Sequence, residues 1–374
     1  MTKQQSYFII AMAYLSLFGL GLADTLRGAL FPEILIKYTL SNSQGSWFFI
    51  TTSLFSIVAG YSSHSLARAI SLFNTWRAGV LFMGLGSLGI YLASNFSLVL
   101  IGCATLGIGF GILSVTQNIL ITKVSPKRLT KKLLSGLHSM YGLASFFAPL
   151  MVAQFASRGL SWPLLFLWAG LIVFLLLAIS FRIRSPRIPD DPPAEDHQNQ
   201  RFFTKPQLLF AFMVGSYVAM EILVTTRLTS YLTQNLNWSI EAASTYLTYF
   251  FISLLTGRFL FSILHFPLST KKTLLISLVG SMILNLLGLH LHPIYLTLTG
   301  LFMAPFYPVA MAFLAERFPQ KLSPMIGLII AFQSSFVILM NLLMGQLTDL
   351  YGIQIAMNSA FAFGGLSWFL LMFI

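Results

Sequence analysis

Long apolar runs separated by short polar segments make up almost the whole chain. A helix that crosses a lipid bilayer needs about 20 mostly apolar residues. Stretches of roughly this length and character occur twelve times, and each predicts one membrane-spanning helix: Tyr7–Phe31, Trp47–Ala67, Ala78–Ala93, Ser97–Thr122, Leu133–Ala156, Trp162–Phe181, Gln207–Thr233, Ala243–Leu264, Thr273–Leu291, Pro293–Ala315, Pro324–Leu347 and Ile353–Ile374.

One segment in the middle of the chain differs from all the other polar segments. Residues 182–206 (RIRSPRIPDDPPAEDHQNQRFFTKP) are charged, rich in proline and poor in apolar side chains. This composition is typical of a solvated linker. Because it divides the predicted spans six and six, we predict an N-terminal six-helix bundle at 1–181, a cytoplasmic linker at 182–206 and a C-terminal six-helix bundle at 207–374.

Composition supports an all-α membrane protein. Hydrophobic residues make up 56% of the 374 positions and charged residues only 9%, and the mean hydropathy is +0.81. Soluble proteins carry roughly a quarter charged residues, so this chain has too few to cover a water-facing surface. The net charge of +12 does not indicate a nucleic-acid partner, because the basic residues fall between the apolar runs.

The distribution of basic residues also predicts the orientation. With both termini in the cytoplasm, all but four of the 22 lysines and arginines fall in inward segments. Lys37 and Arg158 lie in outward segments, while Arg27 and Arg227 lie inside spans. Cytoplasmic loops of membrane proteins carry this excess of positive charge. We therefore expect a multi-pass protein of a bacterial inner (plasma) membrane, surrounded by the lipid bilayer.

The two halves of the chain show a weak internal repeat. An offset of 197 positions pairs Asp24 with Glu221 and Gln44 with Glu241. The same offset pairs Ser56–Gly60 (SIVAG) with Ser253–Gly257 (SLLTG), which both have small residues four positions apart, as closely packed membrane helices do. Internal repeats are a feature of secondary transporters.

Several motifs in this order resemble the major facilitator superfamily, and within it the branch of fucose permease and its sugar:proton symporter relatives. The residues that carry the resemblance are spread over most of the chain: Phe31-Pro32, Leu40–Gln44, Asn118, Leu137–Ala144, Pro149, Glu221, Gly257-Arg258, Ala304–Pro308 and Gly345–Gly352. The resemblance implies twelve helices in two six-helix bundles, alternating access, and uptake of a sugar-like solute with protons.

The chain also departs from the patterns of its possible relatives. His64 stands where the superfamily usually has an aspartate four residues after the glycine that is Gly60 here. Gly28 and Ser114 occupy the positions of two acidic residues of fucose permease, so fucose itself is not carried over. Drug:proton antiporters typically have a Gly-Pro pair in the fifth helix, whereas Gly142 and Pro149 are separated here.

Ionisable residues inside the spans are the first candidates for function. A charged group at a helix centre costs about 2.5–3.5 kcal/mol, so it usually marks a transport pathway or an ion pair. Asp24 and Arg27 share one helix face and can form such a pair, while Glu221 and Arg227 are six residues apart and face different ways. We predict that Asp24 and Glu221 couple transport to a cation, most simply a proton, and that Arg27 and Arg227 contact the substrate.

Other polar residues at membrane depth supply hydrogen-bonding groups for a solute. The predicted substrate-binding set therefore also includes Gln117, Asn118, His138, Tyr141, Tyr307, Gln333 and Asn341. His138 has two further interpretations, as a group that titrates near neutral pH or as a histidine bonded to a neighbouring helix. The glycines Gly102, Gly107, Gly109 and Gly111 are interpreted as helix-packing positions.

The sequence contains no metal-ligand cluster and no nucleophile–base arrangement, so we expect no cofactor and no enzyme activity. The main hypothesis is a secondary active transporter that moves a small polar, sugar-like solute with protons. The alternatives are an organic-anion or siderophore carrier, motivated by Arg27 and Arg227, and a drug efflux antiporter. A non-transporting membrane scaffold or receptor is a fourth reading, against which the intramembrane charges argue.

Overall fold

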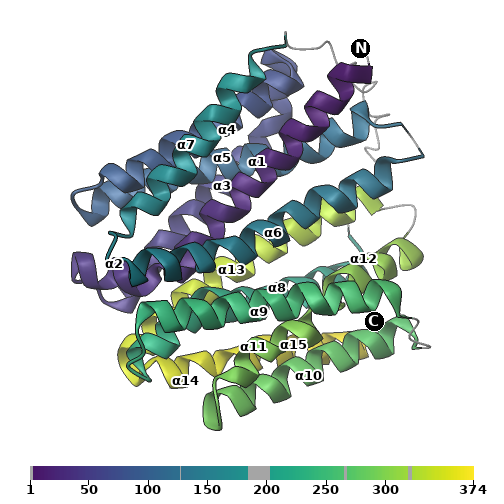
Figure 1. Ribbon diagram of the computed structural model, residues 1–374. Coiled ribbons are helices and arrows are strands. Elements are labelled where there is room, and N and C mark those ends of the chain that lie inside the picture. The colour runs from purple at the N-terminus through teal and green to yellow at the C-terminus, as the bar shows by residue number, and fades with distance from the viewer. Residues whose placement is uncertain (1–2, 127, 184–202, 265–267, 319–321) are drawn as a thin grey trace. The chain divides into compact units, whose positions relative to one another are not determined.

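A computed structural model describes residues 3–126, 128–183, 203–264, 268–318 and 322–374. These residues form fifteen α-helices and no strand (Figure 1). Most of the predicted linker at 182–206 lies outside the described residues. The all-α fold class predicted from the hydrophobic pattern is confirmed.

The chain forms two compact units, which are described separately. Unit 1 comprises Met1–Arg27 and Trp47–His197. In Figure 1 its helices run from purple to teal. They are α1 (Lys3–Ala29), α3 (Asn42–Ile70), α4 (Leu72–Leu92), α5 (Phe96–Val124), α6 (Thr130–Ser157) and α7 (Pro163–Ser180). The last residues of α1 and the first residues of α3 belong to the second unit. Helix α4 packs along both α5 and α7.

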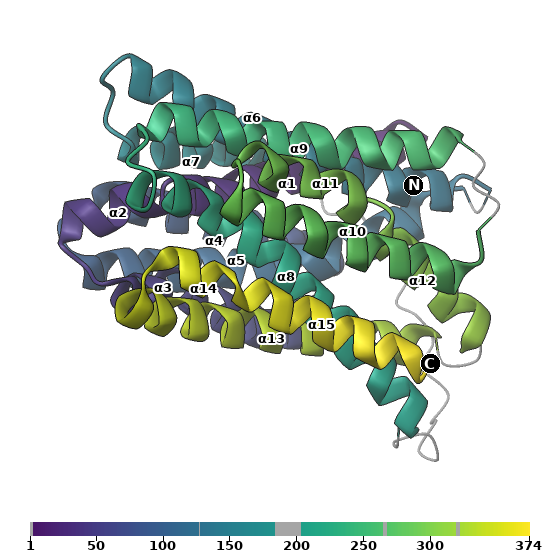
Figure 2. The same ribbon diagram turned by 90° about the horizontal axis from the view of Figure 1, so that it is seen from below.

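Unit 2 comprises Gly28–Ser46 and Gln198–Ile374. Its long helix α8 packs against α13 and α15, and α11 packs against both α9 and α10 (Figure 2). Its helices are α2 (Phe31–Tyr38), α8 (Lys205–Gln234), α9 (Ile240–Ile263), α10 (Thr270–His290), α11 (Ile294–Met303), α12 (Phe306–Arg317), α13 (Leu322–Tyr351), α14 (Ile353–Met357) and α15 (Ser359–Met372).

These helices correspond in order to the twelve predicted spans, with α2 as an additional short helix. Among the described residues, nine helical stretches are long and apolar enough to cross a membrane by length and hydropathy. The other three spans are α3, α4 and α9, with 29, 21 and 24 residues. Each reaches the length of about 20 residues that a membrane span needs.

The tenth span is not the single continuous helix that the apolar run predicts. It is divided into α11 and α12 by a turn at Ala304 and Pro305. Pro305 has no backbone N–H for the Leu301 carbonyl four residues earlier, which breaks the ladder of helical hydrogen bonds at this point. The twelfth span is also divided, into α14 and α15, at Asn358.

Glycines of α5 bring the helices of unit 1 into close contact. A Cβ at Gly102 would lie 2.9 Å from Ile90 N of α4, and one at Gly111 would lie 2.7 Å from Gly60 N of α3. Real Cβ atoms do not approach other atoms this closely, so only glycine fits there. The interpretation of these residues as helix-packing positions is confirmed. Gly257, the repeat counterpart of Gly60, similarly packs α9 against α11 at Ala304.

The segment Gly28–Ser46 packs within unit 2, although the predicted N-terminal bundle 1–181 contains it. Thr229 Oγ1 donates to the Gly28 carbonyl over 2.9 Å. At the start of α3, the Asp349 carboxylate accepts the backbone N–H groups of Asn42 and Ser43, each at 2.8 Å. The bundles 1–181 and 207–374 remain a prediction about how the chain divides.

Candidate functional site

The first group of candidate residues lies between α1 and α6 in unit 1. Asp24 and Arg27 form the ion pair that their spacing on α1 predicts. Tyr141 of α6 donates its hydroxyl to the other carboxylate oxygen of Asp24 over 2.6 Å. Next to Asp24, Thr25 donates a 3.0 Å hydrogen bond to Ser145, which lies one turn after Tyr141 on α6. The structure therefore brings together three predicted site residues, which we call the Asp24 cluster: Asp24, Arg27 and Tyr141.

Arg27 is the most unusual member of the Asp24 cluster, since only 6% of its surface is exposed. Its guanidinium lies 5.6 Å from the ring centroids of Phe49 and Phe110 and 6.0 Å from that of Phe48. Arginine is attracted to aromatic faces at such distances. Its Nε and Nη1 atoms are buried and make no hydrogen bond with any described residue. Two donors of a buried cation are thus available to a ligand.

A second group surrounds Glu221 on α8 in unit 2. Tyr217, one turn earlier on the same helix, is within hydrogen-bonding reach of the Glu221 side chain, and Arg258 of α9 is close enough to exert a favourable charge interaction. Tyr217 is fully buried, donates to the Met303 carbonyl over 2.8 Å and stacks on Phe306 with 3.7 Å between ring centroids. We call Tyr217, Glu221 and Arg258 the Glu221 cluster.

The sequence analysis missed Arg258 and Tyr217 as site residues. Arg258 was counted with the inward-facing basic residues, although it falls inside the predicted span Ala243–Leu264. In the structure it lies inside α9, which continues to Ile263. Its Nε atom is buried and makes no hydrogen bond with a described residue. The available signal was the spacing of four between Tyr217 and Glu221, which places both side chains on one helix face.

Two predicted residues, Tyr307 of α12 and Gln333 of α13, lie beside the Glu221 cluster. Their side chains share a hydrogen bond, and Tyr307 is close enough to Glu221 for an electrostatic interaction. The Nε2 atom of Gln333 is buried without a hydrogen-bond partner among the described residues. This hydroxyl and amide therefore extend the Glu221 cluster with groups that can bind a hydroxylated solute.

Arg227 and Asn341, also predicted, form a third group, which differs from the two clusters because it contains no carboxylate. Arg227 is 2% exposed, and its Nη2 donates to Ser46 Oγ and to Asn341 Oδ1, both at 3.0 Å. Its guanidinium lies 4.2 Å from the centroid of the Phe31 ring. Two of these contacts hold the segment Gly28–Ser46 to α8. This geometry is that of a structural anchor as much as of a substrate ligand.

The remaining predicted residues, Gln117, Asn118 and His138, take different positions. Gln117 is fully buried, and its amide and the Trp76 indole both hydrogen-bond to Ser16 Oγ, at 2.8 and 3.0 Å. Asn118 is partly exposed and donates to the Ser114 carbonyl over 2.7 Å. His138 is exposed on α6, three residues before Tyr141. The contacts of Gln117 link three helices, so we leave it out of the proposed binding surface.

Within the described ranges, no group of three or more His, Cys, Asp or Glu side chains could hold a metal ion. Both clusters instead combine a carboxylate, a tyrosine hydroxyl and an arginine. Such a combination binds and releases protons and offers charged and neutral donors to a ligand.

Comparison with known proteins places this geometry in context. The family model described as Major Facilitator Superfamily matches residues 13–264 and again 209–374. No curated protein sequence gives a significant match. Solved structures match over nearly their whole length at low sequence identity, which shows a shared fold.

Three of these structures illustrate the range of relatives. A D-xylose-proton symporter has a TM-score of 0.77 and 14% identity, over 98% of this chain and 96% of that chain. The E. coli fucose:proton symporter has a TM-score of 0.64 and 18% identity, over 97% and 98%. A bacterial homologue of the human lysosomal transporter Spinster has a TM-score of 0.73 and 13% identity, over 100% and 97%.

The helical architecture, the repeated match of the family model and these full-length structural likenesses agree with one another. The chain is a multi-pass membrane transporter, and it belongs to the major facilitator superfamily.

Proposed function

We propose that this chain is a secondary active transporter that moves a small polar, sugar-like solute together with protons by alternating access. One observation carries the proposal. Each unit contains one acidic residue within a span, Asp24 or Glu221, bonded to a tyrosine and paired with or close to an arginine. The two acidic residues are 197 positions apart, at equivalent places in the repeat.

This arrangement can link proton binding to solute binding. Burial disfavours the charged form of a carboxyl group, whereas a nearby arginine favours it. If opening and closing of the pathway changes the water around Glu221, the balance between these two effects changes as well. Proton affinity then depends on conformation, and the proton and the solute affect each other's binding reciprocally.

The polar side chains near the clusters support a hydroxylated substrate. Tyr141, Tyr307 and Gln333 offer hydroxyl and amide groups, and the Gln333 Nε2 donor has no partner among the described residues. Sugar hydroxyls both donate and accept hydrogen bonds, so they match such a mixture of groups. Two of the structural relatives are named as sugar–proton symporters, for D-xylose and fucose, which supports the same substrate class.

The proposal is tested by transport into proteoliposomes that contain the purified full-length protein. Glu221→Gln removes the titratable group and keeps the side-chain volume. We expect it to abolish accumulation driven by a pH gradient while exchange of labelled solute across the membrane remains largely intact. Asp24→Asn should reduce both activities, because it leaves Arg27 as an unpaired buried cation.

A matched control for Glu221→Gln is Glu241→Gln, which makes the same chemical change at an exposed position in the first turn of α9. This variant should transport like the wild type. Normal proton-driven accumulation by Glu221→Gln would contradict the proposed coupling role. A requirement for sodium instead of a proton gradient would assign the coupling to a different ion.

Arg27 supports a second candidate function, transport of an organic anion or a siderophore. Its Nε and Nη1 donors are buried without partners among the described residues, which suits a carboxylate ligand. A counterflow assay with a panel of labelled hexoses and carboxylates distinguishes the two substrate classes. For an anionic substrate, Arg27→Gln should weaken binding far more than Arg27→Lys. An equal loss for neutral and anionic substrates would indicate a role in folding.

We further propose that both termini lie in the cytoplasm of a bacterial cell, with the protein in the inner membrane. The position of the basic residues between the spans supports this orientation. Reporter domains fused after Ile374 should be active only if they function in the cytoplasm. Activity of a periplasmic reporter at this position would reverse the orientation.

A further inference from the structure

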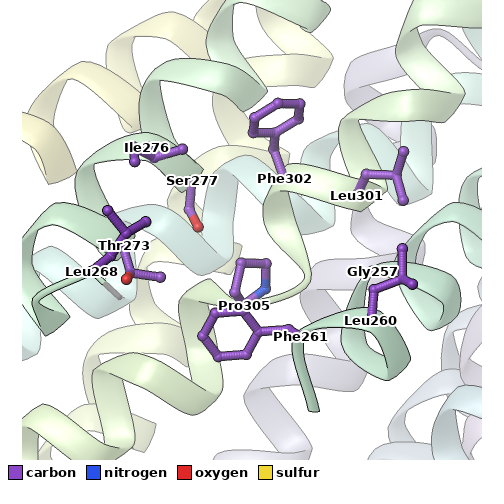
Figure 3. A pocket seen from close by; sticks show the side chains of 10 residues that line it. All are labelled: Gly257, Leu260, Phe261, Leu268, Thr273, Ile276, Ser277, Leu301, Phe302 and Pro305. Atoms are coloured by element: carbon purple, nitrogen blue, oxygen red, sulfur yellow. The ribbon is translucent and has the colours of Figure 1, made fainter. Parts of the chain in front are cut away.

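Outside both clusters, unit 2 contains an apolar cavity of about 230 Å³. It lies between α9, α10 and the break between α11 and α12, and Figure 3 shows the side chains that surround it. Leu260 and Phe261 line it from α9, Ile276 and Ser277 from α10, and Phe302 and Pro305 from the break. None of these residues belongs to the proposed transport site.

The cavity opens on a surface that faces the bilayer. Leu260, Ile276 and Phe302 line the cavity and are themselves exposed. Next to them on α9, Phe259 and Ile263 are 63% and 60% exposed. In a membrane protein, an exposed apolar surface of this kind contacts lipid chains rather than water.

One polar atom inside this apolar cavity has no protein partner. Ser277 is 1% exposed, and its Oγ makes no hydrogen bond with any described residue. Figure 3 shows its hydroxyl turned toward the middle of the lining side chains. Across from it, Pro305 supplies no N–H to the Leu301 carbonyl, and both residues line the cavity. Buried polar groups are normally hydrogen-bonded, so an unpartnered hydroxyl at this point indicates a ligand with a polar atom there.

A lysine lies on α10 next to Thr273, which lines the cavity. Lys272 is exposed in the first turn of α10, four residues before Ile276, which places the two side chains on the same stripe of the helix. Ser277 is five residues deeper, or about 7.5 Å along the axis at 1.5 Å per residue. The neighbouring Lys271 differs, because its Nζ points to the Met372 carbonyl at 3.5 Å.

We propose that this cavity binds one anionic phospholipid of the surrounding bilayer. An acyl chain fills the apolar space, an ester or glycerol oxygen bonds to Ser277 Oγ, and the phosphate contacts Lys272. Charge complementarity selects this occupant over a neutral lipid, because the exposed Lys272 lies one turn before Ile276 of the cavity lining. The site is separate from the Asp24 and Glu221 clusters and does not depend on which solute is transported.

The experiment measures binding of phosphatidylglycerol and phosphatidylcholine, with identical acyl chains, to the delipidated full-length transporter in detergent by native mass spectrometry. Wild-type protein should bind one phosphatidylglycerol more tightly than phosphatidylcholine. A surface lysine near an anionic lipid contributes about 1 kcal/mol, so Lys272→Gln should weaken phosphatidylglycerol binding about fivefold. Lys271→Gln removes the same charge from the adjacent residue and should have little effect.

The cavity itself is tested by filling it. Ile276→Trp should displace the acyl chain and weaken binding of both lipids, whereas Ile283→Trp, at an exposed position two turns further along α10, should leave binding unchanged. Thermal unfolding without added lipid verifies that each variant is folded. Equal effects of the two lysine variants, equal effects of the two tryptophan variants, or equal binding of both lipids to the wild type would each overturn the proposal.

Discussion

At the scale of single residues, the two clusters share a carboxylate, a tyrosine hydroxyl and an arginine, but they differ in how the charges are arranged. In the Asp24 cluster the carboxylate and guanidinium are directly paired. In the Glu221 cluster Arg258 acts from a neighbouring helix and forms no ion pair with Glu221 within the described part of the chain. Because Glu221 has no direct ion pair among the described residues, it is the better candidate for proton exchange.

Tyr141 provides a test of the Asp24 cluster that separates function from packing. Tyr141→Phe removes the hydroxyl bonded to Asp24 and should reduce solute exchange several-fold, with a loss of about 1 kcal/mol in the free energy of unfolding. Tyr14→Phe removes another hydroxyl between α1 and α6, whose 2.6 Å bond goes to the Leu133 carbonyl. It should cost the same stability and leave exchange unchanged. Thermal unfolding and counterflow measured on both variants check this, and parallel losses of exchange would make Tyr141 a packing residue.

At the scale of helices, close approach at glycine determines how α5 packs. Around Gly111, a Cβ would overlap the Ser56 carbonyl oxygen and come within 2.7 Å of Gly60 N. The backbone atoms there cannot move aside as a flexible side chain would, so the helices themselves have to separate. The two small residues of the first repeat motif are thus the direct neighbours of a third small residue on α5.

Gly111→Ala should therefore destabilise the protein by about 1–3 kcal/mol, the usual cost of overpacking. Gly365→Ala makes the same change inside α15, where nothing lies within 4 Å of the added methyl group. It should stabilise by about 0.5–1 kcal/mol, because alanine loses less backbone entropy than glycine in a helix. Thermal unfolding of both variants in one detergent gives the comparison. A neutral Gly111→Ala would show that α3 and α5 can separate freely.

The start of α3 is stabilised from two sides. Ser41 and Gln44 cap it reciprocally, with Gln44 N donating to Ser41 Oγ at 3.2 Å and Ser41 N to Gln44 Oε1 at 3.0 Å. From α13, the Asp349 carboxylate accepts the next two N–H groups. A negative group at a helix N-terminus also interacts favourably with the helix dipole.

Asp349→Ala should lower the free energy of unfolding by about 0.5–2 kcal/mol, as the loss of a helix cap does. Asp349→Asn keeps one acceptor oxygen and should lose less. Melting curves recorded at the same pH and ionic strength check the order of the three proteins. An alanine variant as stable as the wild type would mean that water replaces the carboxylate without cost.

At the scale of the whole molecule, the single cysteine reports on global unfolding. Cys103 is the only cysteine of the 374 residues, and it is fully buried in α5. Because it lies among the packed helices of unit 1, it should react with a membrane-permeant maleimide only when the unit opens. We expect labelling to follow the loss of helical signal during thermal unfolding. Ser139→Cys, at an exposed position of α6, should be labelled in the folded protein, which checks the reagent. Rapid labelling of native Cys103 would contradict its burial.

The sequence by itself determined the features that depend on the solvent and on local spacing. The bilayer core contains no water to hydrogen-bond the backbone, so a long apolar run has to form a helix that satisfies its own backbone groups. The ends of these helices were predicted to within a few residues. The pair Asp24–Arg27 followed from a spacing of three, and the glycines of α5 followed from their pattern. These features depend on neighbours along the chain, which a sequence displays directly.

Only the tertiary structure decided which distant residues meet. It brought Arg258 to Glu221, joined Tyr307 to Gln333, enclosed Gln117 in a network with Ser16 and Trp76, and packed Gly28–Ser46 within unit 2. An uninterrupted apolar run does not reveal which helix face touches which neighbour, because lipid and protein interior are equally apolar. The partners of each charge therefore depend on the rotation and packing of whole helices, which the hydrophobic pattern does not contain.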